Sequence, residues 1–74
     1  MITEHQAIQM LREAYENAPH GENMLSIQLF GIRHADQLEG MNLSKLASDA
    51  TGKELGVELN YGVKLSRHVV LKQP

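Results

Sequence analysis

The amino-acid sequence predicts a mostly α-helical domain built from four short helices. The chain has 74 residues, which is room for one domain, so a single domain spanning residues 1–74 is expected. Hydrophobic residues make up 42% of the chain, but only three of them are Phe or Tyr and none is Trp, so the core must be aliphatic. Apolar side chains recur at spacings of three and four through several segments, which is typical of amphipathic helices.

The first helix is expected over residues 3–17. Thr3 is a favourable N-cap, and Gln6 three residues later completes a capping box. Pro19 and Gly21 end the helix, because proline disfavours a helical conformation at the preceding residue. Between these signals lies one apolar stripe, formed by Ala7, Ile8, Leu11, Ala14, Tyr15 and Ala18.

Residues 24–39 admit two interpretations. Leu25, Ile27 and Leu29 alternate with other residues, so a short strand over 24–29 is one alternative. A helical pattern accounts for more of the segment and predicts a helix over 26–38 that is closed by Gly40. Its apolar face consists of Ile27, Phe30, Gly31, Ala35 and Leu38.

The third helix is expected over residues 43–50. Asn42 or Ser44 can cap it, and Gly52 is suited to the left-handed position that commonly follows a helix. The apolar side chains of this segment follow helical spacing, at Leu43, Leu46, Ala47 and Ala50.

The last segment also has two interpretations. Alternation at Val57, Leu59, Tyr61, Val63 and Leu65 favours a strand or a β-hairpin. A helix beginning at about residue 53 accounts for sixteen residues rather than about ten, although Gly56 and Gly62 each cost a helix about 1 kcal/mol. We therefore predict a helix, with Val69-Val70-Leu71 leaving it as a short strand near 69–72. Its apolar arc would contain Leu55, Leu59, Val63, Leu65, Val69 and Val70.

Positive charge is concentrated at the C-terminal end of the chain. Residues 1–52 carry three basic and seven acidic side chains, whereas residues 53–74 carry four basic side chains against Glu54 and Glu58. On the predicted last helix, one polar face would hold Lys53, Asn60, Lys64, Arg67, His68 and Lys72.

The third and fourth helices, joined at Thr51-Gly52, have the size and order of a helix–turn–helix. In DNA-binding versions, the early residues of the second helix approach base edges and basic residues contact phosphates. Lys53, Glu54, Val57 and Asn60 would then lie near the bases, and Asn60 could pair with adenine. The phosphate contacts would come from Tyr61, Lys64, Arg67 and His68.

Two stretches, Leu29-Phe30-Gly31-Ile32-Arg33-His34-Ala35 and residues 61–69 (YGVKLSRHV), resemble small helix–turn–helix-like domains of uncharacterised bacterial and phage-associated proteins. The resemblance spans most of the chain. It implies a compact four-helix, helix–turn–helix-like domain that binds DNA or a protein partner, and it supplies no catalytic residues. The connection at Thr51-Gly52-Lys53 is shorter than such domains lead us to expect.

Several other classes of function lack sequence support. There is no cysteine, so neither a disulfide nor a thiolate zinc site can form. The four histidines are scattered, no serine lies in a G-x-S-x-G motif, and Gly52-Lys53 is not part of a phosphate loop. We therefore expect no enzyme activity, metal, cofactor or small-molecule substrate. Neither a leader peptide nor a membrane span is evident, which predicts a cytoplasmic protein that does not bind membranes.

The sequence thus leads to two hypotheses. The first is binding to duplex DNA through Lys53, Asn60, Lys64, Arg67 and His68. The second is a protein-interaction or regulatory module, as a homodimer or with another protein. Val57 and Leu71 fall outside the apolar arc and support this second hypothesis, whereas Tyr61 is expected to pack under the first helix.

Overall fold

The computed structural model describes residues 2–72 of the chain and contains four helices in that range. They are α1 (Glu4–Glu16), α2 (Asn23–Leu38), α3 (Leu43–Thr51) and α4 (Gly56–Leu65). The mostly α-helical prediction is therefore confirmed. Residues 1, 73 and 74, the ends of the expected 1–74 domain, lie outside the described range.

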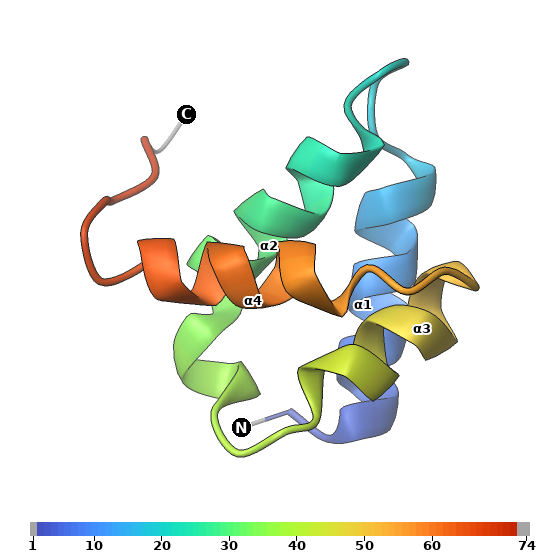
Figure 1. Cartoon of the computed structure of the whole chain (residues 1–74), viewed down its shortest axis with the longest axis horizontal. Helices are drawn as coiled ribbons and strands as arrows, with labels where there is room; N and C mark the ends of the chain where they lie inside the picture. The colour runs from blue at the N-terminus through green and yellow to red at the C-terminus, as the bar shows by residue number, and fades with distance from the viewer. Residues whose placement is uncertain (1, 73–74) are drawn as a thin grey trace.

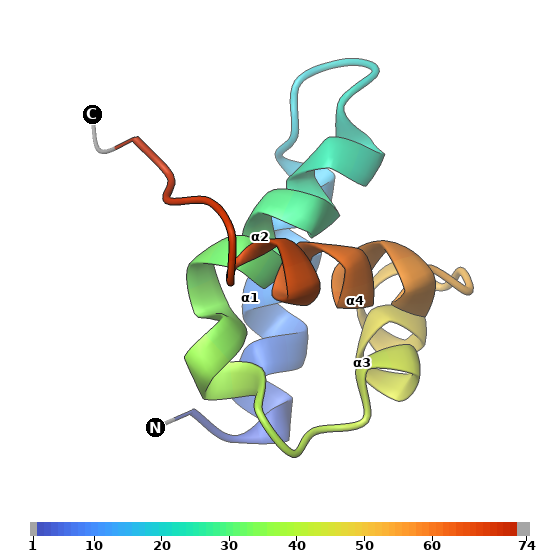
Figure 2. The same cartoon turned by 60° about the vertical axis from the view of Figure 1, so that its left-hand side comes forward.

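Helix α4 lies across α2, and α3 packs beside α1 and α4 (Figures 1 and 2). The most extensive contact between helices is the one between α2 and α4. All four helices contribute to a single core, as their amphipathic patterns require. Its buried members are Ala7, Leu11, Ile27, Phe30, Leu38, Leu46, Ala47, Ala50, Leu55 and Leu59.

The N-terminus of α1 has the predicted capping box. The Thr3 hydroxyl accepts a hydrogen bond from the Gln6 backbone N–H at 3.1 Å, and the Gln6 side chain accepts one from the Thr3 N–H at 2.9 Å. The predicted apolar stripe faces the core, with Ala7 and Leu11 fully buried.

The interpretation of residues 24–29 as a strand is wrong, because they belong to α2. This helix has one non-helical residue, His34, whose ring lies 4.6 Å from that of Phe30, between centroids. Gly40 follows the helix with a φ of 84°, a conformation that glycine adopts without strain. Asn42 caps α3 through a 3.1 Å hydrogen bond from the Lys45 N–H to its side-chain oxygen.

Helix α4 is shorter at both ends than the sequence predicts, and the β-hairpin alternative is wrong. It begins at Gly56 rather than near residue 53, because Gly52 is left-handed, with a φ of 75°, and opens a turn that continues to Leu55. It ends at Leu65, where the Arg67 and His68 N–H groups bond to carbonyls three residues back and tighten the chain.

The C-terminal tail, residues 69–72, corrects two further predictions. Its residues form no strand, so the predicted short strand near 69–72 is wrong. Val69 and Val70 lie beyond α4, and Val70 is 93% exposed rather than part of the apolar arc. The tail leaves the end of α4 in both views (Figures 1 and 2), and Val69–Leu71 share a shallow hollow with Ile32 and Arg33 of α2.

Candidate nucleic-acid interface

Helices α3 and α4 form the predicted helix–turn–helix, with residues 52–55 as the connection. The two helices approach closely at Gly56, which is buried. A Cβ atom at this position would lie only 2.6 Å from the Ser44 Cα. Because α4 begins only at Gly56, the connection is longer than the predicted Thr51-Gly52-Lys53. Glycine at the start of α4 nevertheless allows α3 and α4 to pack tightly.

The Thr51 side chain fixes the connection between the two helices. Its hydroxyl donates to the Ala47 carbonyl at 2.7 Å and accepts from the Lys53 N–H at 3.1 Å. These bonds hold the backbone of Lys53 in the turn before α4, so Lys53 is not on the helix where the sequence pattern had placed it.

Helix α4 has one buried side and one exposed side. Leu59 and Gly62 are buried against the rest of the domain. The opposite side carries a line of residues at helical spacing, from Val57 through Asn60 and Tyr61 to Lys64. We call these four residues the outer face of α4.

The outer face includes two exposed apolar side chains. Val57 is 78% exposed, in agreement with its place outside the predicted arc. Tyr61 is 53% exposed, so the expectation that it packs under the first helix is wrong. The reason is that α4 packs mainly on α2 and α3.

The five sequence-predicted site residues are all exposed, but they do not share one helix face. Asn60 and Lys64 lie on α4, Lys53 lies in the turn before it, and Arg67 and His68 lie in the turn after it. Cationic residues therefore occupy both ends of α4. Lys72, which the sequence had placed on the same helix, lies instead on the tail.

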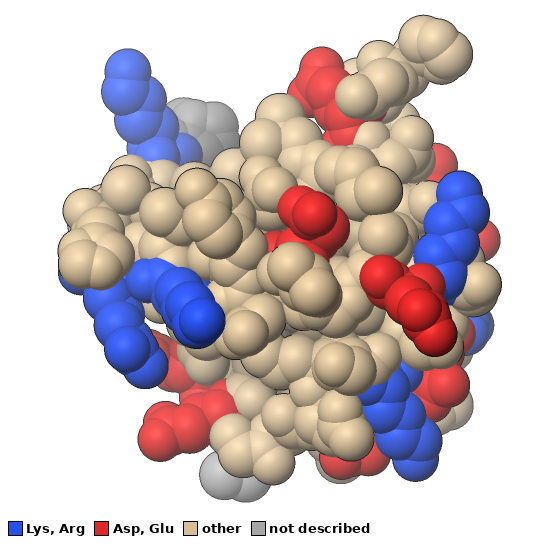
Figure 3. All heavy atoms as spheres, viewed as in Figure 1, with Lys and Arg blue, Asp and Glu red and all other residues tan. Residues whose placement is uncertain are grey.

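Figure 3 shows how charge is distributed over this side of the molecule. Basic side chains gather at the C-terminal end of α4, with acidic side chains directly beside them. Other acidic side chains lie over the middle of the view and near the turn after α3, where basic side chains are also present. The Glu58 carboxylate accepts a hydrogen bond of 2.6 Å from the Gln28 amide, which ties this acid to α2. Arg67 lines a hollow that also contains Asp36 and Glu39.

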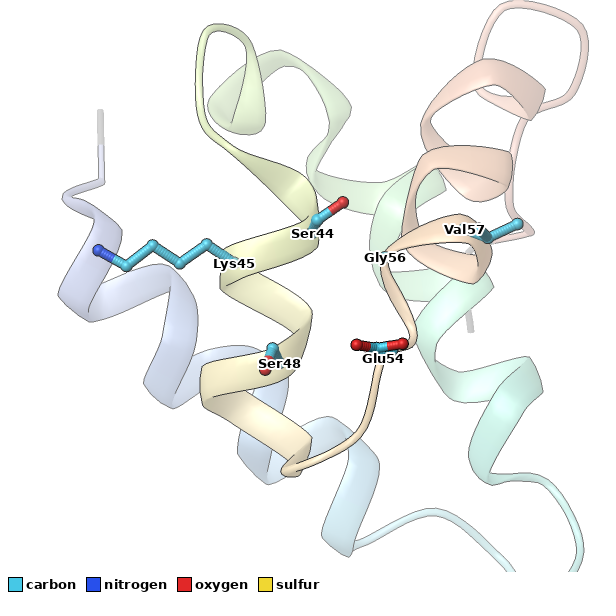
Figure 4. A pocket seen from close by; sticks show the side chains of 6 residues that line it. All are labelled: Ser44, Lys45, Ser48, Glu54, Gly56 and Val57. Carbon is cyan, nitrogen blue, oxygen red and sulfur yellow. The ribbon is translucent and has the colours of Figure 1, made fainter.

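A groove of ≈ 470 Å³ lies between α3 and the start of α4. Figure 4 shows Glu54 between α3 and the start of α4, while Val57 points outward and Lys45 extends away from the groove. Ser44 and Ser48 complete its α3 wall. The sequence had not singled out Lys45, although its place outside the apolar pattern of α3 already indicated the polar side of this helix.

Arg12 is a second residue whose role the sequence did not reveal. Its guanidinium donates to the Asp49 and Ala50 carbonyls, at 3.0 and 3.4 Å, at the C-terminal end of α3. A cation at that end of a helix complements the helix dipole. Arg12 thus joins α1 to α3 through a separation of 37–38 residues, which no local pattern signals.

No group of three or more His, Asp or Glu side chains able to hold a metal ion is found among residues 2–72. Nor does any helix in that range have the length and apolarity needed to cross a membrane.

The fold defines the class of protein: a small helical domain with a helix–turn–helix at its C-terminal half. A family model described as "HTH-like domain" matches residues 3–72, and the chain belongs to this family. Comparisons with curated proteins and with solved structures gave no match.

Proposed function

We propose that this domain binds duplex DNA, without catalysing a reaction, through the outer face of α4. The observation that carries the proposal is the position of exposed cations at both ends of the second helix of a helix–turn–helix. Lys53 precedes α4, and Lys64 and Arg67 lie at its other end, next to the exposed His68. In known docking geometries this helix enters the major groove. Binding to DNA requires that the protein reside in a compartment that contains DNA. The cytoplasmic location expected from the sequence is compatible with this requirement.

The charge of the whole chain does not oppose this proposal. The net charge is −2, but the acidic excess belongs to residues 1–52. Of the two acids nearest the outer face, Glu58 accepts a hydrogen bond from Gln28 of α2, and Glu54 lies between α3 and the start of α4 (Figure 4). Residues 53–72 carry four basic side chains against these two acids, so this part of the chain is net positive.

A titration of labelled duplex DNA at several salt concentrations tests the proposal. Binding should weaken steeply as salt rises, because each phosphate contact releases counterions. Lys64→Ala and Arg67→Ala should each reduce the slope of log K against log salt by about 1. Arg33→Ala is the matched control, since it removes the same charge from an exposed position on α2. Absence of binding at low salt, or an equal effect of Arg33→Ala, would contradict the proposal.

The exposed apolar side chains favour a second candidate function, a protein-interaction module. Val57 is 78% and Tyr61 53% exposed on the same face, and exposed apolar groups commonly mark protein contacts. This function predicts indifference to DNA and either self-association or a bound protein partner. Sedimentation over a concentration series measures the self-association. Val57→Ser should then weaken it, whereas Lys64→Ala should leave it unchanged.

A further inference from the structure

The middle of the outer face of α4 is uncharged, and both cations and acids lie around it. Val57, Asn60 and Tyr61 occupy this middle, between Lys53 on one side and Lys64 on the other. Asn60 is exposed, and its amide makes no hydrogen bond with any described residue. It therefore offers one donor and one acceptor group to a ligand.

Neither acidic neighbour competes for this amide. The Glu58 carboxylate is held by the Gln28 amide of α2, at 2.6 Å. Figure 4 shows Glu54 between α3 and the start of α4, with Val57 pointing away from it. The Asn60 amide and the Val57 methyl groups are therefore both exposed for contact with a ligand, next to these two acids.

The dimensions of α4 fit the major groove. A helix with its side chains is about 10–12 Å across, which matches the groove width of about 12 Å, and the ten residues of α4 extend about 15 Å from end to end. Cations at the two ends would then lie near the phosphates on the two sides of the groove. The uncharged middle would lie over base edges, where the early residues of a recognition helix normally make contact.

The chemistry of these two side chains selects one type of base pair. An asparagine amide can pair in bidentate fashion with the N6 and N7 atoms of adenine, and an apolar side chain can contact the thymine methyl group. Val57 precedes Asn60 by three residues, a rise of about 4.5 Å, which is close to the 3.4 Å spacing of neighbouring base pairs.

On the basis of the proposed function, we infer that Asn60 and Val57 determine sequence specificity, by reading an adenine and a nearby thymine in the major groove. Asn60 supplies the adenine contact, and Val57 supplies the contact with the thymine methyl group. Lys64 and the other cations contribute affinity that does not depend on sequence, because phosphates carry no base information.

Selection from a pool of randomised duplexes, followed by titration of the enriched duplex, tests this inference. The enriched sequence should contain an A·T pair whose replacement by G·C weakens binding about tenfold. In the same duplex, 7-deazaadenine removes the N7 acceptor and deoxyuridine removes the thymine methyl group. Each change should weaken binding to the unaltered protein, by several-fold for 7-deazaadenine and less for deoxyuridine.

Variants connect each base change to one side chain. Asn60→Ala should bind the 7-deazaadenine duplex and the normal duplex equally, while remaining sensitive to deoxyuridine. Val57→Ala should show the opposite pattern. Asn60→Asp, which keeps the side-chain size but loses the amide donor, should lose the adenine preference as Asn60→Ala does. Lys64→Ala is the matched control and should weaken binding to all duplexes by the same factor.

The outcomes separate this inference from the proposed function. Salt-dependent binding with no A·T preference, or a preference that persists in Asn60→Ala and Asn60→Asp, would overturn the inference and leave DNA binding intact. Absence of binding to every duplex would overturn the proposed function and the inference together. Circular dichroism of each variant establishes that α4 is retained, as expected for substitutions at exposed positions.

Discussion

Helices α1 and α4 are stabilised in different ways. Helix α1 has strong local signals: a complete capping box between Thr3 and Gln6, and no glycine within Glu4–Glu16. Helix α4 begins without a side-chain cap at Leu55 and contains Gly56 and Gly62, two residues that disfavour a helix. On local propensity alone, α1 would form more readily than α4.

Tertiary packing compensates for the weak local signals of α4. It crosses α2 where Gly31 faces the backbone of Leu59 and Val63, and where Gly62 faces the backbone of Gln28. Only glycine permits backbones to approach this closely. The residues that weaken α4 as an isolated helix are therefore those that allow it to pack. We expect replacement of a glycine of α4 by alanine to destabilise the domain, although alanine has the higher helix propensity.

The substitution Gly62→Ala should have the largest effect. Alanine raises helix propensity by about 1 kcal/mol, but its Cβ would lie against the Gln28 carbonyl group, 2.9 Å from the carbonyl carbon. Because that neighbour is backbone, the crossing must open, and we expect the free energy of unfolding to fall by about 3 kcal/mol. Urea denaturation followed by circular dichroism measures it, with Lys64→Ala as the exposed control on the same helix. A stabilised Gly62→Ala variant would show that α4 depends on propensity after all.

The substitution Gly56→Ala tests the contact of α4 with α3. The new Cβ would lie 2.6 Å from the Ser44 Cα and 2.8 Å from its hydroxyl oxygen. A partial shift of the connection at residues 52–55 can relieve some of the overlap, so we expect a loss of about 2 kcal/mol. This corresponds to a decrease in Tm of about 10 °C for a domain of this size. Val57→Ala, at the next and exposed position, should leave the Tm nearly unchanged; an equal decrease there would mean that helix start, rather than contact, is responsible.

The same difference between local and tertiary signals explains how much of the fold the sequence could predict. The capping box at Thr3, the Asn42 cap and the left-handed Gly52 are local, and all three were predictable. The extent of α4 was not, because the Thr51 hydroxyl that holds Lys53 in the turn, and the tightening after Leu65, interrupt a hydrophobic pattern that continues in the sequence. A periodicity shows which residues can share a face but not where the helix ends.

The candidate site was predictable in composition rather than in arrangement. The pattern identified Asn60 and Lys64 as exposed residues of α4, and it identified Val57 as lying outside the apolar arc. It could not place Lys53 and Arg67 beyond the two ends of the helix, nor reveal that Gln28 binds Glu58 across 30 residues. Long-range hydrogen bonds of this kind have no periodic signature.

The substitution Thr3→Ala should have a smaller effect, confined to α1. It removes the hydroxyl that accepts from the Gln6 N–H, and loss of such a cap lowers the free energy of unfolding by about 1 kcal/mol. Urea denaturation measures the change, and Thr3→Ser, which keeps the hydroxyl, is the matched control. If both variants were destabilised equally, the threonine methyl group rather than the cap would be important, and α1 would depend less on local signals than we infer.

The substitution Asn60→Ala should have the smallest effect and the opposite sign. Asn60 is exposed and lies within α4, so no packing contact opposes the higher helix propensity of alanine. We expect the free energy of unfolding to rise by about 0.5 kcal/mol. Together with the expected loss of stability in Gly62→Ala, this gain in the free energy of unfolding would show two things. Helix propensity determines stability on the outer face of α4, and packing determines it on the buried side. A destabilised Asn60→Ala, measured by the same urea denaturation, would instead mean that the amide has a structural role in the free protein. Loss of DNA binding in that variant could then not be attributed to a base contact.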